Sequence, residues 1–263
     1  MGAVKVHHLN CATMRPALSP TMVAHVLLVE RDEGLLLVDT GFGTGDLTDA
    51  GRLPKPFHLL VRPVLDPGET ALAQVEALGF SVDDVTDIAL THMDLDHAGG
   101  LSDFPAARVH LHQPEYDAMT HPTMREKQRY ISAQWAHGPK WEQHAEPGDD
   151  WFGFPSVTAL GDDVLLIPLL GHTRGHAGVA VKDSDGHWLL HAGDAFFDGN
   201  QVQTPPSCNR SLAAFQVMMA VDNKLRRTNT ERLKELVASH SDEVSVFCAH
   251  DRAQYDALVG AAG

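Results

Sequence analysis

The stretch that decides the fold is THMDLDHAGG, residues 91–100, which directly follows the strand-like run Val85–Leu90. Four side chains able to bind a metal ion lie within six residues of this stretch: His92, Asp94, Asp96 and His97. On a strand the first three would point the same way, and a tight turn would bring His97 to them. Four grouped donors suit a pair of ions better than one ion. The stretch therefore predicts a metal centre at the end of a strand.

Three later segments repeat this order of an apolar strand followed by a metal-competent side chain. The strands 164–170, 188–191 and 244–248 precede His172, Asp194 and His250, respectively. Because the carboxyl ends of strands converge on one edge of an α/β sheet, all four sites are expected to meet there.

The remaining pattern predicts further strands and helices in both halves of the chain. Strands are expected at 4–9, 23–30, 35–39, 108–112 and 178–182, and helices at 69–78, from 114, at 211–226 and at 230–239. Strands followed by helices in each half favour a four-layer αββα sandwich over residues 1–263 as one domain. The glycines at 41, 43 and 45 do not have the spacing of a dinucleotide-binding loop.

Five segments together resemble the metallo-β-lactamase superfamily, in the hydrolase branch that contains glyoxalase II and the acyl-homoserine lactonases. The resemblance runs from about Val23 to His250, and its segments are residues 37–41, 92–97, 171–176, 193–194 and 249–250. These motifs are specific for the αββα fold and its metal site, and poorly specific for the substrate.

The resemblance also implies roles for individual residues. One metal would be bound by His92, Asp94 and His172, the second by Asp96, His97 and His250, and Asp194 would bridge both. Asp39 resembles a residue that orients the ligands without binding metal, and His176 and His191 are expected to be structural or to support the ligands.

Two positions depart from the family pattern. Most hydrolases of the family have His where this chain has Asp94, and the flavo-di-iron proteins have a carboxylate there, although this chain has no room for their flavodoxin domain. Two divalent ions are expected, zinc first, with iron or manganese competitive because of the added oxygen donor. Phe197 stands where lactonases have a Tyr, so no phenol hydroxyl is expected to polarise a substrate carbonyl there.

The predicted activity is hydrolysis of an ester-like bond, in a lactone or carboxylic ester. Two cations that share a water molecule would provide a bridging hydroxide as the nucleophile. Asp96 is the candidate to carry a proton to the leaving group, beside the bridging Asp194. No Gly-x-Ser-x-Gly elbow is present to suggest a serine hydrolase.

Residues 120–153 lack a regular pattern and are interpreted as a partly helical insertion that forms a pocket wall. Its candidate substrate-binding residues are Tyr130, Trp135, His137 and Trp141, to which Phe197 is added from outside the insertion. The alternatives are a packed surface flap or a contact between the subunits of a homodimer.

Three rival functions are also compatible with these motifs. The formal net charge of −15 disfavours nucleic-acid binding and a phosphodiesterase, because phosphate recognition needs clustered Lys and Arg. A di-iron or mono-iron oxidoreductase on the same fold is motivated by Asp94. A non-catalytic binding protein is the weakest alternative, since all seven ligand positions hold competent donors.

The sequence and its composition also indicate the compartment and the kind of partner to expect for the protein. No signal peptide or apolar run of membrane-spanning length is evident, so neither secretion nor a membrane partner is expected. The three cysteines, Cys11, Cys208 and Cys248, fit a reducing cytoplasm and suggest neither disulfides nor a thiolate metal site. The expected partner is a small-molecule substrate.

Overall fold

The computed structural model describes residues 4–49, 51–145, 148–155, 157–158 and 161–262, and its first sheet has six strands in sequence order. These strands are β1 (Lys5–Met14), β2 (Met22–Arg31), β3 (Gly34–Val38), β4 (Val85–Ala89), β5 (Arg108–His112) and β6 (Lys140–His144). The first three pair antiparallel, and β3, β4, β5 and β6 run parallel to one another. The carboxyl ends of β3, β4 and β5 therefore open at the same edge.

The second sheet has five strands in the order β13-β12-β11-β10-β9. They are β9 (Val157–Thr158), β10 (Val164–Pro168), β11 (Ala177–Lys182), β12 (Trp188–His191) and β13 (Val244–Phe247). Only β12 and β13 are parallel. A separate hairpin consists of β7 (Asp150–Trp151) and β8 (Phe154–Pro155).

Alternation along the strands builds the contact between the two sheets. In β2, Leu27 and Val29 face a core that they share with β10 and β11 of the other sheet, whereas Val26 and Leu28 face the helices on the outside. All four side chains are fully buried. A strand buried on both faces reads as a continuous apolar run, as the sequence of β2 does.

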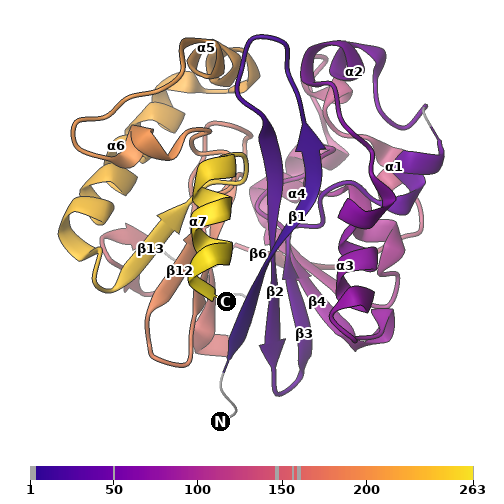
Figure 1. Ribbon diagram of the computed structural model, residues 1–263, viewed down its shortest axis with the longest axis horizontal. Coiled ribbons are helices and arrows are strands. Elements are labelled where there is room, and N and C mark those ends of the chain that lie inside the picture. The colour runs from indigo at the N-terminus through magenta and orange to yellow at the C-terminus, as the bar shows by residue number, and fades with distance from the viewer. Residues whose placement is uncertain (1–3, 50, 146–147, 156, 159–160, 263) are drawn as a thin grey trace.

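Helices cover the outer face of each sheet (Figure 1), which completes the predicted four layers. The α-helices are α1 (Thr44–Thr48), α2 (Lys55–Val61), α3 (Ala71–Ala77), α4 (Gln113–Thr120), α5 (Arg210–Met219), α6 (Asn223–His240) and α7 (Arg252–Ala262). Short 3-10 turns are η1 (Pro67–Glu69), η2 (Val82–Asp84), η3 (Gly99–Asp103), η4 (Glu126–Gln128), η5 (Ser132–Gln134), η6 (Gly161–Asp163) and η7 (Gly199–Val202). Figure 1 shows α3 and α6 on opposite sides of the strands.

The helix predicted at 211–226 is interrupted in the structure, and this corrects the sequence-based expectation. Helix α5 ends at Met219, and Asp222 caps the start of α6 by accepting a hydrogen bond from the N–H of Leu225. Between them, the N–H groups of Val221 and Asp222 donate to the carbonyls of His172 and Gly171. The chain leaves the helix because this segment supports the loop that carries His172.

The insertion predicted at 120–153 is also more regular than expected at its end. Its residues 140–144 form β6, which pairs with β5 through a mostly polar sequence that has no apolar alternation to reveal it.

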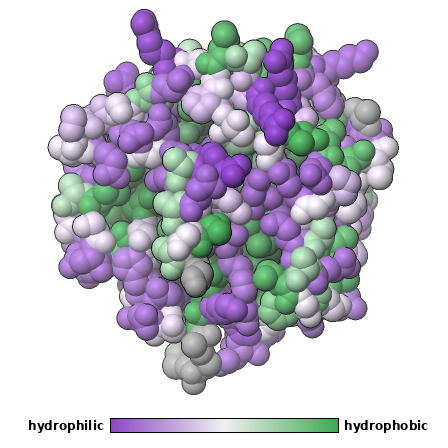
Figure 2. Space-filling model, viewed as in Figure 1, coloured by the Kyte–Doolittle hydropathy of each residue, from purple (hydrophilic) through white to green (hydrophobic). Residues whose placement is uncertain are grey.

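The face seen in Figure 2 is predominantly hydrophilic, with hydrophobic side chains in small groups. In the described part of the chain, no helix combines the length and apolar character needed to cross a membrane.

Candidate metal centre

The loop that follows β4 holds the cluster that the sequence singled out. A tight turn closes it, in which the N–H groups of His97 and Ala98 donate to the carbonyl of Asp94 at 2.9 and 3.0 Å. This turn brings His97 round to the other three donors, as predicted. His92 and Asp94 are buried, and the Asp96 side chain is slightly more open.

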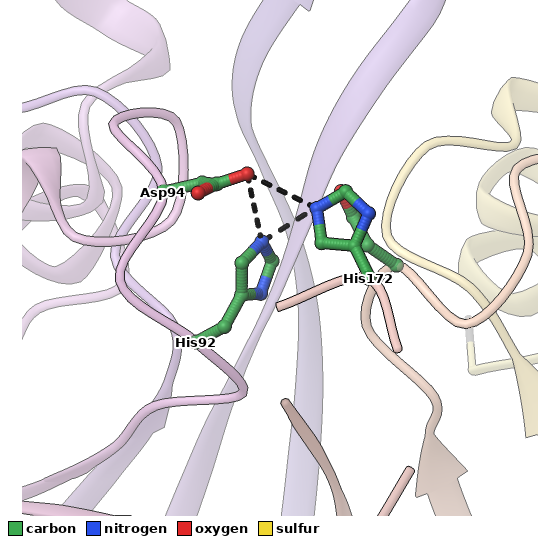
Figure 3. Close-up of side chains that lie close together, drawn as sticks. His92, Asp94 and His172 are labelled. Atoms are coloured by element: carbon green, nitrogen blue, oxygen red, sulfur yellow. Dashed lines mark hydrogen bonds and ion pairs between the residues drawn. The ribbon is translucent and has the colours of Figure 1, made fainter. Parts of the chain in front are cut away.

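The other three predicted ligands lie in loops that follow strands of the second sheet. His172 follows β10, Asp194 follows β12 and His250 follows β13. Figure 3 shows the side chains of His92, Asp94 and His172 pointing toward one another. The seven predicted ligands form two groups, within each of which the ligand atoms lie within 4.8 Å of one another: His92, Asp94, His172 and Asp194, and Asp96, His97 and His250.

Asp194 connects the two groups, because its two oxygens face different imidazoles. Its Oδ2 lies 3.2 Å from Nε2 of His172 and 3.7 Å from Nε2 of His92. Its Oδ1 lies 3.1 Å from Nε2 of His250 and 3.4 Å from Nε2 of His97. This is the geometry expected of a carboxylate that bridges two ions.

The residues present fit a pair of metal ions. Nε2 of His92, Nε2 of His97 and Oδ1 of Asp194 are buried and have no hydrogen-bond partner. Such groups are costly unless a ligand pairs with them. In the first group, the distances from the two imidazoles to Oδ2 of Asp94 are 3.0 and 3.4 Å. A tetrahedral zinc ion with ligands at about 2.0–2.1 Å separates those ligands by about 3.3–3.4 Å.

Asp39 and Thr91 hold two of the imidazoles in the required orientation. The Asp39 carboxylate accepts hydrogen bonds from the N–H and hydroxyl of Thr91 and from Nδ1 of His97, each at 2.8 Å. Since the Thr91 hydroxyl donates to Asp39, it accepts from Nδ1 of His92 at 2.9 Å. Both rings therefore turn Nε2 into the centre. Nδ1 of His250 likewise donates to the carbonyl of Val23.

His176 and His191 support the loop that carries Asp194. His176 donates through Nδ1 to the carbonyl of Leu169 and accepts through Nε2 from the N–H of Asp194 at 2.9 Å. His191 accepts from the N–H of Gly193. Gly193 has φ +53°, and a Cβ there would lie 2.6 Å from Nε2 of His176, so the close approach requires glycine.

Arg129 is a member of the site that the sequence did not reveal. Its Nε donates to Oδ1 of Asp94 at 2.6 Å, and one terminal nitrogen donates to Oδ2 at 2.5 Å. The same nitrogen lies 2.8 Å from Nε2 of His172. Arg129 comes from the irregular insertion, 35 residues after Asp94. A lone Arg in an irregular segment carries no sequence signal for such a contact.

The charges of the site shift the pKa values of its carboxylates in opposite directions. Burial alone would raise the pKa of Asp94, but the adjacent Arg129 and His92 hold it well below its usual range. For Asp96, burial outweighs the attraction of His97 and His250, and its pKa is raised. Burial also lowers the pKa of His92 to about 4, which favours the neutral imidazole that binds metal.

A cavity of about 220 Å³ opens onto the metal centre, next to Asp94, Asp96, His172, Asp194 and His250. Most of its remaining wall is apolar: Met14, Met22, Pro54, Pro56, Phe57, Leu60, Val61, Leu95, Phe197, Phe215, Met218, Met219 and Val221. Phe197 lies at the metal side of the cavity, with its ring 5.0 Å from that of His250 and 5.9 Å from that of His172.

The insertion supplies part of this wall, but through residues other than the aromatic ones predicted. Arg125, Glu126, Gln128 and Arg129 line the cavity, whereas Tyr130, Trp135, His137 and Trp141 do not. Tyr130, Trp135 and Trp141 pack against the core beside the first sheet, and His137 is exposed. The hydroxyl of Tyr130 donates to Glu115. The three aromatic rings instead pack in or against the core cluster that contains Ile88 of β4 and Val109 of β5.

Comparisons with known proteins agree with this geometry. The sequence profile of the metallo-β-lactamase superfamily matches residues 20–240. The chain belongs to the metallo-β-lactamase superfamily. It is 44% identical over 252 residues to a probable metallo-hydrolase of Mycobacterium tuberculosis. The matched region covers 94% of this chain and 80% of that relative.

At lower identity, the chain is also similar to lactonases. An N-acyl homoserine lactonase of Bacillus thuringiensis is 24% identical over 249 residues, or 92% of this chain and 88% of that protein. A solved N-acyl homoserine lactone hydrolase, with N-hexanoyl-L-homoserine at its catalytic metal centre, superimposes with a TM-score of 0.75 at 20% identity. That match covers 98% of this chain and 97% of the solved one, and it confirms the predicted fold.

Proposed function

We propose that this member of the superfamily is a metal-dependent hydrolase of an ester bond, and most directly of the ring ester of a lactone. The observation that carries the proposal is the position of Asp194, with one oxygen toward each group of ligands at the floor of an apolar cavity. The metallo-hydrolase and lactonase names of its relatives support the same reaction class.

Two divalent ions bound in this centre would supply an activated water molecule and polarise the carbonyl of the substrate. The chain's own residues set the arrangement. Asp194 fixes the spacing of the two ligand groups, and His176 fixes the backbone of Asp194. Asp96 lines the cavity, and it would take up the proton released by the activated water molecule and pass it to the departing alkoxide.

The walls of the cavity favour a substrate with an apolar acyl or ring substituent. Phe57, Phe215 and Met218 lie on the walls, and the polar groups gather around the metal ligands. A pocket of this kind fixes one polar group at its floor and binds the remainder by burial of apolar surface. Phe197 offers no hydroxyl, so orientation of the substrate carbonyl would rest on the bound ions.

We further propose zinc in both positions, since four of the seven candidate ligands are imidazoles, which favour zinc, and Asp94 makes iron or manganese the competitors. The described cysteines are all free thiols. This agrees with a reducing compartment, and we propose the cytoplasm.

The test begins with metal analysis of protein purified without added metal. The protein is then assayed against lactones with short and long acyl chains, linear esters, thioesters and phosphodiesters, with Asp194→Ala as the inactive control. We expect two zinc ions per chain and faster hydrolysis of lactones or esters that carry an apolar chain.

Two outcomes would replace the proposal. Bound iron with oxygen-dependent turnover and no ester hydrolysis would make the protein an oxidoreductase. Hydrolysis confined to phosphodiesters would make it a phosphodiesterase, despite its acidic charge of −15.

A further inference from the structure

Arg129 is held so completely by the protein that its guanidinium has a fixed position beside the metal centre. Nε and one terminal nitrogen bind the two oxygens of Asp94, and the other terminal nitrogen donates to the carbonyls of His172 and Met219 at 3.2 and 2.9 Å. The residue is only 9% exposed. A planar guanidinium with its donors engaged in this way orients a carboxylate better than a flexible ammonium group does.

The segment that carries Arg129 is tied to the loop of a metal ligand. Arg174, two residues after His172, binds both oxygens of Glu126 through Nε and a terminal nitrogen, at 2.8 and 3.2 Å. The N–H of Arg129 donates to the carbonyl of Glu126. The contact between Arg174 and Glu126 therefore holds the segment that carries Arg129 against the loop that carries His172.

This arrangement bears on the unusual ligand at position 94. Of the two oxygens of Asp94, Oδ2 faces the imidazoles of the centre, at 3.0 Å from His172 and 3.4 Å from His92. Oδ1 accepts from Nε of Arg129, and Oδ2 also accepts from a terminal nitrogen of Arg129, which lies 2.8 Å from Nε2 of His172. The carboxylate is thus turned so that one oxygen points into the site. Its negative charge is matched by the positive charge of Arg129, and together the two side chains are neutral, as an imidazole is.

We propose that Asp94 and Arg129 act as one unit that takes the place of a neutral imidazole ligand. Arg129 is the positioning residue of this unit: it presents a single oxygen of Asp94 to the first metal ion and cancels the added charge. The proposal concerns metal binding only, so it stands or falls separately from the identity of the substrate.

The first experiment measures the coordination of the metal in the full-length protein loaded with cobalt, whose visible absorption depends on ligand number and geometry. In Arg129→Met, Asp94 is free to turn both oxygens to the ion, and we expect the absorption to weaken. Arg125→Met is the matched control, because Arg125 lines the same cavity but donates to the carbonyl of Met218 and not to Asp94. Unchanged absorption in Arg129→Met would overturn the proposal.

The second experiment exchanges the unit for an imidazole. In Asp94→His, the buried Arg129 is left without its carboxylate beside a cation, and we expect the affinity for the first ion, measured by competition with a chelator, to fall by about tenfold or more. Adding Arg129→Met should restore about tenfold. A double variant that binds the ion no more tightly than Asp94→His would overturn the proposal. If Arg129→Met does not fold, Arg129→Lys serves in the first experiment, since one ammonium cannot form the same fork, and a wild-type spectrum would count against the proposal.

Discussion

Asp39 accepts a hydrogen bond of 2.8 Å from Nδ1 of His97, and this bond turns the opposite nitrogen of the ring toward Asp194. Asp39 has φ +62°, in the left-handed region that Asp and Asn tolerate better than most residues. The position therefore combines a backbone requirement with a role in orienting metal ligands. A change from Asp to Asn keeps a residue that tolerates the left-handed backbone conformation, but it alters the group that orients the metal ligands.

For Asp39→Asn, we expect metal affinity to fall by about 10- to 100-fold. Three donors converge on Asp39, from Thr91 and His97, and an amide offers them one acceptor oxygen in place of two. Competition with a chelator measures the change. Asp49→Asn, at an exposed carboxylate that accepts from Gly51, is the control, and equal affinities in the two variants would contradict this role.

Removal of a bridging ligand should differ from removal of a ligand to one ion. We expect His172→Ala to retain about one metal ion per chain, and Asp194→Ala to lose most of both, because Asp194 contacts the two groups. Elemental analysis after dialysis measures the stoichiometry. His187→Ala, on the surface of the second sheet, should keep the wild-type content. Two ions in Asp194→Ala would refute the bridging role.

The apolar wall of the cavity predicts an effect on substrate binding. Met218→Glu places a carboxylate on the wall, and we expect the KM for esters with a long acyl chain to rise by about tenfold, with a smaller effect on kcat. Met124 is also an exposed methionine but does not line this cavity, so Met124→Glu is the matched control. Equal KM values for both variants would place the acyl group elsewhere.

Stability should depend on pH through Asp87, which lies away from the metal centre. Burial would raise its pKa, but hydrogen bonds from His110 and Arg108 lower it to about 2, below the ordinary 3.8. Ionised Asp87 therefore stabilises the fold fully above about pH 4, and this contribution is lost as the pH falls through about 2.

The corresponding variant is Asp87→Asn. It should lower the midpoint of urea unfolding at about pH 6, and the difference from wild type should shrink between pH 4 and 2. A difference that is constant across this range would show that the charge of Asp87 does not contribute.

The two groups of candidate ligands could be predicted to lie together because each candidate follows a strand. The strands are recognisable from their apolar runs, and parallel pairing brings β3, β4 and β5 to one edge, where Asp39 and the 92–97 loop meet. The prediction needed no knowledge of the loop conformations. Arg129 could not be found in this way, because its position depends on the path of an irregular segment and on the Arg174–Glu126 contact.

The cavity wall was harder to predict for a related reason. Helix α2 supplies Phe57 and Leu60 to the cavity, and Leu59 and Leu60 are largely exposed, so the apolar pattern of this helix does not point to the core. Similarly, the apolar spacing at 211–226 continues past Met219, and only Asp222 marks the start of a new helix. The apolar spacing of a helix predicts which of its side chains are buried in the core, whereas these residues line a cavity that opens at the surface.

The candidate metal ligands are divided between the two halves of the sandwich. An ion bound by His92 and Asp94 from one half and by His172 and Asp194 from the other would connect the two sheets at the edge where these residues meet. Since an ion that binds only the folded chain stabilises it by mass action, the thermal midpoint should rise with the concentration of free metal. Removal of the metal would then lower the stability of the fold as well as abolish hydrolysis.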